Sequence, residues 1–325
     1  MAAALTRSQI SHFEDRGYLV ADDVLSSARD LAPIRREYAV LLDDLCRAWY
    51  AQGRLASTYD ALPFCKRLTE VVRESGVDYY QHCDISLPQS DVKEDTPIHV
   101  GPAVFRLLTN PRLLDLVEAL IGPEIYSNPV QHVRIKPPEV VIPDGPNDSA
   151  VAVTPWHQDQ GVTTPDADES LILTVWIPIT DATVENGCML VIPGSHLEGL
   201  TLHCPGTQTQ PELHIPDSGL RLDDAVPLPM QAGQVLFMNR RTKHASLGNR
   251  SDDIRWSFDL RYNPTGHPTG RSAFPGFVAR SRSDPASVLS DPREWADLWY
   301  AARASLAEKS KPVFNRWVGS PAACA

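Results

Sequence analysis

The sequence lacks several features that would place it in common classes of protein. Its 325 residues contain no apolar run of 18 residues, and residues 1–13 hold no apolar stretch long enough for secretion. Basic residues are also few, since 30 Lys and Arg stand against 41 Asp and Glu, for a formal net charge of −11. Such a balance disfavours a nucleic-acid surface and attraction to anionic membranes. We therefore expect a cytoplasmic protein that binds neither nucleic acid nor membrane.

The cysteines form no Cys-x-x-Cys pair, and no repeated or low-complexity segment is present. Scattered cysteines in a chain without a signal peptide predict reduced thiols. A hydrophobic content of 42% and a charged content of 22% are ordinary for a globular protein with a sizeable core. The cysteines in question are Cys46, Cys65, Cys83, Cys188, Cys204 and Cys324.

The first 124 residues have mainly helical periodicity. Thr6-x-x-Gln9 is a capping box that predicts a short helix ending at Gly17. A strand is expected next, over residues 18–25. Apolar residues at helical spacing then predict three further helices. These helices cover residues 28–52, 57–75 and 102–122.

From Ile125 the apolar period changes to about two, which is typical of strands. Many short strands after a helical lead predict a β-barrel or jelly roll with helices on one side. We expect one domain over residues 1–325, divided into a helical lead (1–124), a barrel core (125–265) and a C-terminal extension (266–325). The expected strands are residues 131–135, 151–157, 171–177, 188–192, 234–238 and 254–262.

A His-x-Asp motif formed by His157 and Asp159 is the main candidate site, with His244 following 85 residues after Asp159. The motif ends a strand-like segment, so both side chains are expected on one face. His244 follows another apolar strand and could supply a third ligand. Two imidazoles and one carboxylate occupy one face of an octahedral ferrous ion and leave the other face open. The pattern thus predicts a non-haem iron site that activates oxygen.

His-x-acid triplets occur four times in this chain, so the motif alone is weak evidence. His12 and Glu14 lie two apart on a predicted helix, where their side chains diverge. The triplet beginning at His82 has polar flanks and no third ligand. The triplet beginning at His196 follows a Pro-Gly-Ser turn, and we interpret His196 as structural. Only the triplet at His157 combines strand context with a distal histidine.

Two predicted strands carry polar faces that would line the barrel. Residues 254–262 alternate between polar and apolar side chains, with Arg255 and Arg261 on the polar face. Residues 131–136 alternate in the same way. An arginine inside a barrel can bind a carboxylate through two hydrogen bonds. The simpler alternative is that both faces point to solvent.

Several motifs of this chain occur together in one order and spacing. They are Trp156-His157-Gln158-Asp159, Trp176-Ile177-Pro178, residues 186–196, residues 233–237, and His244-Ala245-Ser246 followed by Asn249 and Arg255, with Phe13 and Gly17-Tyr18-Leu19-Val20 upstream. Together they resemble the phytanoyl-CoA dioxygenase family of iron(II)- and 2-oxoglutarate-dependent oxygenases. The resemblance covers about residues 8–265.

The resemblance implies a double-stranded β-helix barrel of the jelly-roll or cupin type. It implies that Fe(II) is held by His157, Asp159 and His244, and that 2-oxoglutarate and O2 are consumed. The far carboxylate of 2-oxoglutarate would meet Arg255, helped by the hydroxyl of Ser246. Because halogenases of this chemistry have a small residue in place of Asp159, its presence favours hydroxylation, desaturation or ring formation.

Other positions are open to more than one interpretation. Trp176 is displaced by one residue from a family position that lines the cosubstrate pocket. Arg261 would either contact substrate or pair with Asp259. We interpret three tryptophans of the C-terminal extension, Trp295, Trp299 and Trp317, as core residues. A further cosubstrate contact is expected from one of His132, Arg134 and Lys136, which the sequence does not rank.

We expect the substrate to be a small molecule, with a secondary metabolite preferred, and residues 266–282 to form a lid. Two alternatives remain open at this point. One is a cupin-like metal hydrolase or isomerase that does not use 2-oxoglutarate, and the other is a catalytically silent ligand-binding relative. Arg255 and Ser246 favour the oxygenase, since only that activity needs them. The oligomeric state is not predicted.

Overall fold

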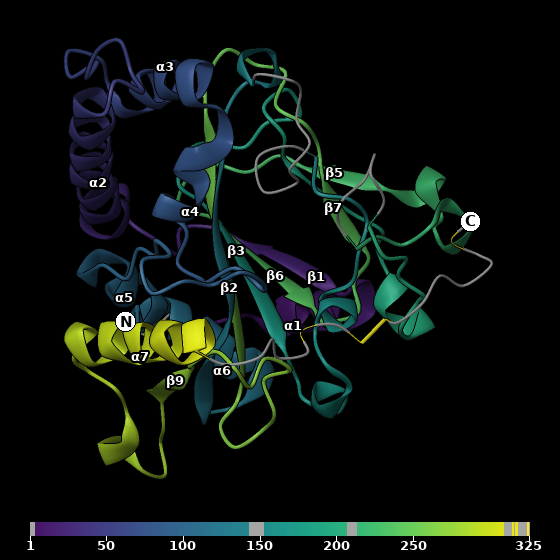
Figure 1. The fold of residues 1–325 in the computed structure, drawn as a ribbon. Helices are drawn as coiled ribbons and strands as arrows, with labels where there is room; N and C mark the ends of the chain where they lie inside the picture. Colours follow the sequence, from purple (N-terminus) through teal and green to yellow (C-terminus); the bar gives the residue numbers. More distant parts are fainter. Residues whose placement is uncertain are drawn as a thin grey trace.

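The computed structural model describes residues 4–142, 153–206, 213–308, 314, 316, 317 and 324. Its strands form two antiparallel sheets, one with the order β1-β6-β3-β8-β2-β9 and one with the order β5-β4-β7. In Figure 1 helices α2, α3, α4, α5 and α7 lie on one side of the larger sheet, and the smaller sheet lies on the other side. The strands are β1 (Tyr18–Ala21), β2 (Ile125–Lys136), β3 (Leu173–Pro178), β4 (Met189–Val191), β5 (Val226–Leu228), β6 (Val235–Asn239), β7 (His244–Ser246), β8 (Arg255–Pro264) and β9 (Phe277–Arg280).

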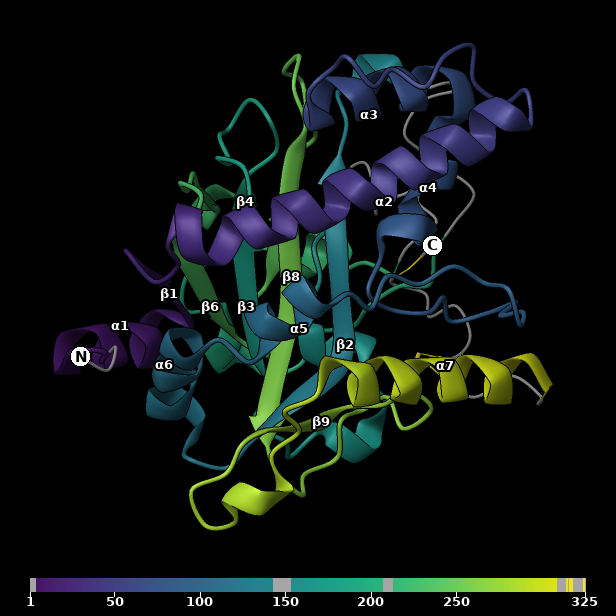
Figure 2. The same ribbon diagram turned by 90° about the vertical axis from the view of Figure 1, so that its left-hand side faces the viewer.

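The helical layer covers the outer face of the larger sheet, and α2 crosses its strands obliquely (Figure 2). Apolar side chains of β8 meet it, since the ring of Tyr38 in α2 lies 4.9 Å from that of Trp256 and 6.1 Å from that of Phe258. The alternation predicted for this strand is thereby confirmed. The α-helices are α1 (Arg7–Arg16), α2 (Ala32–Ala51), α3 (Phe64–Ser75), α4 (Tyr79–Cys83), α5 (Pro102–Leu108), α6 (Pro111–Ile121) and α7 (Pro292–Glu308).

The predicted start of the chain is confirmed in detail. Thr6 and Gln9 form the capping box of α1, and Gly17 ends the helix with a φ of 78°. A side chain at Gly17 would also collide with the ring of His196, at 2.4 Å from its Nδ1. Glycine is therefore needed both for the left-handed conformation and for the close approach. Strand β1 begins directly after Gly17 and lies alongside β6, where Tyr18 pairs with Met238.

Several predicted boundaries are wrong, and prolines explain most of the differences. The helix expected over 102–122 is two helices, because Asn110 caps a new helix whose first residue is Pro111. The helix expected over 57–75 begins only at Phe64, after Pro63. The residues predicted as the start of the long helix form a π-helix, Ser27–Leu31, and α2 follows it.

The strand expected over 151–157 is not a regular strand in the part that the structure describes, residues 153–157. His157 makes one isolated bridge, with His244, through two backbone hydrogen bonds of 3.0 Å. Pro155 has no N–H group to extend a ladder. Residues 151 and 152 lie outside the described residues. The prediction also missed β5, β7 and β9, which are short.

The C-terminal extension folds back on the larger sheet. Trp295 and Trp299 in α7 are buried in the main core, as predicted. Residues 277–280, the last part of the expected lid, are instead the edge strand β9, which pairs with β2. Within the described residues, no helix is long and apolar enough to span a membrane.

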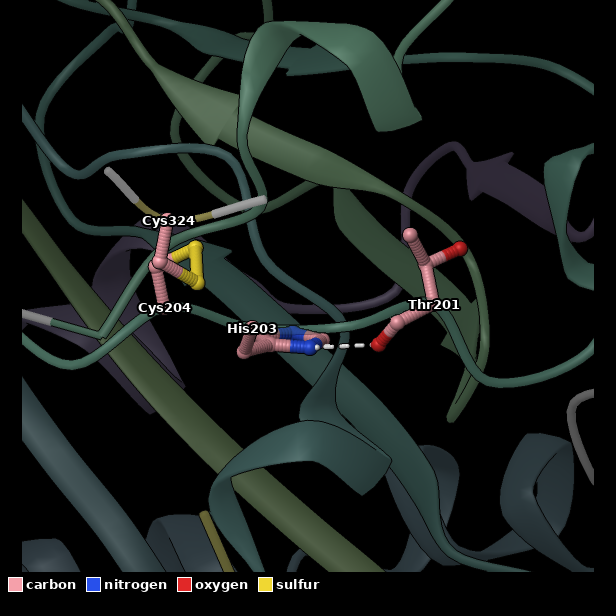
Figure 3. Close-up of a disulfide and its surroundings, with 4 residues drawn as sticks. All are labelled: Thr201, His203, Cys204 and Cys324. Carbon is pink, nitrogen blue, oxygen red and sulfur yellow. Dashed lines mark hydrogen bonds between the residues drawn. A yellow bond between two sulfur atoms is a disulfide. The ribbon is translucent and has the colours of Figure 1, made fainter. Parts of the chain in front are cut away.

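A disulfide joins Cys204 to Cys324 across 120 positions of the sequence (Figure 3). The prediction that all six cysteines are reduced is wrong for this pair. Arg316 donates to the carbonyl of Thr163 (2.8 Å) and Trp317 to that of Gly161 (2.8 Å). These contacts bring the C-terminal residues back toward Cys204, and sequence spacing does not reveal such a return.

Reduction of this disulfide is expected to lower the free energy of unfolding by about 3–5 kcal/mol, because the bond closes a long loop in the unfolded chain. Cys204→Ser should reproduce the loss, whereas Cys65→Ser, at a free cysteine, should not. Urea denaturation with and without reductant measures the effect. A non-reducing peptide map that lacks the cross-linked peptide would contradict the bond itself.

Candidate active site

His157, Asp159 and His244 come together between the two sheets, with one ligand atom of each residue lying within 4.8 Å of the others. Nε2 of His157 lies 3.8 Å from Oδ1 of Asp159, and Nε2 of His244 lies 3.9 Å from the same oxygen. The backbone bridge between His157 and β7 sets the two imidazoles side by side, with centroids 4.2 Å apart. The three donor atoms therefore converge on one point.

Both imidazoles turn Nε2 toward this point and Nδ1 toward a backbone carbonyl. Nδ1 of His157 lies 2.8 Å from the carbonyl of Pro155, and Nδ1 of His244 lies 2.9 Å from the carbonyl of Thr242. A carbonyl only accepts hydrogen bonds, so each Nδ1 carries a proton, and Nε2 is the nitrogen left to bind a metal. Burial, and then repulsion from His244, holds the pKa of His157 well below its usual range. Two imidazoles and a carboxylate are the ligand set of a ferrous ion.

Two residues on neighbouring strands hold the carboxylate of Asp159. Thr174 donates to Oδ2, and Arg261 forms an ion pair with Oδ1. Thr174 in β3 and Arg261 in β8 are register partners, so one position of the sheet provides both contacts. Burial is the largest single influence and would raise the pKa of Asp159, but the charge and hydrogen bond of Arg261 together with the two histidines outweigh it, and the pKa is lowered. Asp159 is therefore ionised and fixed in orientation.

The residue between the two ligands has a structural role. The buried amide of Gln158 donates to the carbonyls of Gly199 (2.8 Å) and Arg241 (2.6 Å) and accepts from the backbone of Thr201 (2.7 Å). These three bonds tie the segment carrying His157 and Asp159 to two neighbouring loops. Glutamine at this position thus keeps the ligand pair in place.

A second polar group forms where β2, β7 and β8 face each other. Lys136 and Arg255 are register partners on adjacent strands. Nζ of Lys136 donates to Oγ of Ser246 at 2.5 Å, across the space between the sheets. Arg255 donates to Ser257 at 2.5 Å. Two cationic side chains and a hydroxyl thus meet inside the barrel, as the alternation of the strands predicts.

Arg255 is 1% exposed, and its Nε has no hydrogen-bond partner among the described residues. Its guanidinium carbon lies 5.6 Å from the ring centroid of Trp176. Burial, and then repulsion from Arg134, lowers the pKa of Arg255 to about 9. A buried cation with an unused donor fits a carboxylate ligand such as the far end of 2-oxoglutarate. The structure thus brings Trp176 beside Arg255.

A pocket of 720 Å³ opens beside the triad and reaches His157, Thr154 and Arg261. His132 and Arg134 line it as well, whereas Lys136 is not among its lining residues. His132 contacts Asp84 (2.9 Å), and Arg134 contacts Asp259 (3.7 Å). Of the three candidates that the sequence left unranked, Lys136 is the one that lies beside Ser246 and Arg255.

The structure also shows the contacts of the other residues that the sequence left open to interpretation. Arg261 lies 3.6 Å from Asp259, as one interpretation predicted, and it contacts both Asp159 and the pocket. His196 contacts the carbonyl of Glu14 through Nε2 (2.9 Å), which agrees with a structural role. Trp317 stacks on His203, with centroids 5.4 Å apart, outside the main core.

Three residues near the site were missed by the sequence prediction. They are Thr174, which holds Asp159, and Asp84 and Arg271, which line the pocket. Thr174 had a usable signal, because it alternates with apolar residues on a predicted strand next to Trp176. Asp84 belongs to the triplet that begins at His82, which was set aside as a metal site, and Arg271 had no signal because the position of its loop depends on tertiary packing.

His203 forms hydrogen bonds that hold the segment carrying His157 and Asp159. Its Nε2 accepts from the backbone of Gln158 (2.9 Å), and Nδ1 donates to the carbonyl of Thr201 (2.8 Å), the bond drawn in Figure 3. This tautomer requires a neutral ring. Burial is the largest influence and lowers the pKa of His203 to about 4 from 6.5.

Acidification is therefore expected to destabilise the protein through His203. The unfolded chain binds a proton on this histidine near pH 6.5, and the folded chain does so only near pH 4. Stability is thus complete above pH 6.5 and is lost as the pH falls toward 4, by roughly 3 kcal/mol. Urea unfolding at pH 7.5 and pH 4 measures this loss. His203→Gln should weaken the dependence, and an unchanged slope would contradict the assignment.

Known proteins resemble this chain in both sequence and fold. The sequence model of the phytanoyl-CoA dioxygenase (PhyH) family matches residues 13–257. Phytanoyl-CoA dioxygenase domain-containing protein 1 of Danio rerio is 24% identical over an alignment of 266 residues. The alignment covers 77% of this chain and 87% of that protein. Among solved structures, the non-heme monooxygenase ThoJ in its apo form aligns with a TM-score of 0.57 at 20% identity, over 92% of this chain and 97% of that chain.

A further solved structure is SnoK, a non-heme alpha ketoglutarate dependent carbocyclase from nogalamycin biosynthesis. It aligns with a TM-score of 0.50 at 19% identity, over 88% of this chain and 94% of that chain. At such identities these structures establish the fold, which is the double-stranded β-helix expected from the sequence. The family match covers most of the chain, and the converging triad agrees with it. The chain belongs to the phytanoyl-CoA dioxygenase family and is an iron- and 2-oxoglutarate-dependent dioxygenase.

Proposed function

We propose that this enzyme hydroxylates an unactivated C–H bond of a small molecule, with His157, Asp159 and His244 as the iron ligands and Arg255, Ser246 and Lys136 as the site for the far carboxylate of 2-oxoglutarate. The observation that carries the proposal is the convergence of two imidazoles and one carboxylate beside a pocket that also reaches Arg261. The bound iron and 2-oxoglutarate would supply the oxidation, with release of succinate and CO2.

The protein's own residues would bind and orient the metal and the cosubstrate, and they would exclude water. Thr174 and Arg261 hold both oxygens of Asp159, so the carboxylate presents a fixed face to the metal. The carbonyls of Pro155 and Thr242 keep the histidines in the metal-binding tautomer. Lys136 and Arg255 provide two positive charges for one carboxylate in a water-poor interior. His157 lies on the pocket wall, so substrate carbons can approach the ligand set directly.

The size and polarity of the pocket support a small substrate. A volume of 720 Å³ falls in the range of small-molecule sites. A secondary metabolite is our preferred substrate class, and the similarity in fold to SnoK, an enzyme of nogalamycin biosynthesis, is consistent with that preference. Asp159 favours hydroxylation, desaturation or ring formation over halogenation, since the carboxylate occupies the position that a halide would need.

Succinate release tests this proposal most directly. The enzyme with Fe(II) and 2-oxoglutarate would be screened against a metabolite panel, with mass detection of the product. We expect substrate-dependent succinate and a product heavier by one oxygen atom. An absent charge-transfer absorption with Fe(II) and 2-oxoglutarate under anaerobic conditions would contradict the metal and cosubstrate assignment. A product lighter by two hydrogens would replace hydroxylation with desaturation or ring formation.

A further inference from the structure

Two buried arginines lack an ion pair among the described residues. Four arginines are buried there, and two of them have carboxylate partners: Arg67 with Asp43 (3.1 Å) and Arg261 with Asp159. Arg255 and Arg271 have none. A buried charge without a counterion is costly, so such residues commonly bind an ionic ligand. The proposed function assigns 2-oxoglutarate to Arg255 and leaves Arg271 without a counterion.

Arg271 is held rigidly at the pocket wall. It is 4% exposed, and one Nη donates to the carbonyl of Val162 at 2.8 Å. Its guanidinium carbon lies 5.9 Å from the ring centroid of Phe274 and 5.2 Å from that of Phe314. These contacts restrain the side chain without neutralising it. Its Nε is buried and has no hydrogen-bond partner among the described residues.

The preceding residue explains how Arg271 reaches the pocket. Gly270 has a φ of +69°, and a side chain there would lie 2.4 Å from Cβ of Thr163. Glycine therefore lets the loop pack directly against the segment that follows Asp159, and Gly270 accepts a hydrogen bond from the backbone of Thr164 (3.2 Å). Arg271 is thus anchored next to the triad-bearing segment.

The other charges of the pocket do not compensate Arg271. Its wall also carries Arg134 and Arg261, and its two acidic residues are both engaged elsewhere. Asp84 binds His132 and the backbone of Val133, and Asp78 pairs with Arg54. Burial, and then repulsion from Arg261, lowers the pKa of Arg271 to about 10, which leaves it charged at neutral pH.

We propose that Arg271 binds an oxyanion of the substrate, so that this enzyme oxidises an anionic small molecule. The group is a carboxylate, or a phosphate or sulfate ester, since each offers oxygens to a guanidinium fork. The inference rests on the proposed function and names the substrate class for the same site. Arg271 then fixes one end of the substrate, while His157 marks the wall at which oxidation takes place.

Anion binding can be measured before the substrate is known. Wild-type enzyme with Fe(II) and saturating 2-oxoglutarate, kept anaerobic, would be titrated with acetate, inorganic phosphate or sulfate at constant ionic strength. We expect a saturable rise in Tm that Arg271→Gln abolishes and Arg271→Lys partly retains. Arg282→Gln is the matched control, because Arg282 is 60% exposed and pairs with Glu118. The anion that saturates at the lowest concentration identifies carboxylate, phosphate or sulfate.

The outcomes separate this inference from the proposed function. An intact charge-transfer absorption without a saturable anion effect, or with the same effect in Arg271→Gln, overturns the inference alone. A missing absorption in the wild type overturns the proposed function. In the succinate screen, acids should release more succinate than their methyl esters. Arg271→Gln should raise the KM of an acid substrate about 10- to 100-fold. Equal activity on acids and esters would also overturn the inference.

Discussion

His157→Ala is expected to lower succinate formation by about a thousandfold or more, because losing one of three metal ligands removes several kcal/mol of metal-derived stabilisation of the transition state. Asp159 and His244 alone offer two donor atoms in place of three, so they would bind the metal more weakly and would not fix its position. Succinate formation and the anaerobic absorption with Fe(II) and 2-oxoglutarate would both be measured.

His12→Ala is the matched control for this change. His12 belongs to another His-x-acid triplet, is exposed, and contacts only the ring of Tyr18 among the described aromatic pairs, at 5.4 Å. It should retain full activity and the full absorption. If His157→Ala kept the absorption, or if His12→Ala lost it, the assignment of the triad would be wrong. Circular dichroism would confirm that both variants are folded.

Arg255→Gln is expected to raise the KM for 2-oxoglutarate about 30- to 150-fold, because charge-assisted hydrogen bonds worth about 2–3 kcal/mol are lost. Arg255→Lys should fall between the wild type and Arg255→Gln, since an ammonium keeps the charge but loses the planar fork. Initial rates across 2-oxoglutarate concentrations give this comparison. Lys136→Met should raise the same KM, since Lys136 is the register partner of Arg255.

Arg282→Gln serves as the control here too, and it should leave the KM for 2-oxoglutarate unchanged. The effect should be confined to the cosubstrate, so iron affinity should change little in Arg255→Gln. An unaltered KM in Arg255→Gln would remove 2-oxoglutarate from this site. Arg255 would then have only the contact with Ser257 as its assigned hydrogen bond.

Local sequence patterns predicted much of the site for identifiable reasons. A two-residue period places Arg255 and Arg261 on one face of β8 whatever the rest of the chain does. The capping box at Thr6 and the left-handed Gly17 likewise depend only on nearby residues. Helix boundaries near prolines were predicted less well, because Pro63 and Pro111 begin new elements inside apolar patterns that continue through them.

Contacts between distant segments could not be predicted in this way. The pairing of Thr174 with Arg261, which holds Asp159, depends on the register of two strands that lie far apart in the sequence. The bond between Cys204 and Cys324 depends on where the chain returns after α7. Neither relation leaves a periodic signal, because strand register and loop closure are set by packing of the whole molecule.

The sequence by itself determined the ligand types, the polar faces of the strands and the family, since these follow from residue identity, spacing and order. Only the tertiary structure decided that Lys136 lies beside Ser246 while His132 and Arg134 line the pocket. It also decided that Arg271 reaches the pocket wall without a carboxylate partner among the described residues. The physical reason is that burial and charge pairing are properties of three-dimensional neighbours, and those neighbours come from opposite sheets and from loops that only packing brings together.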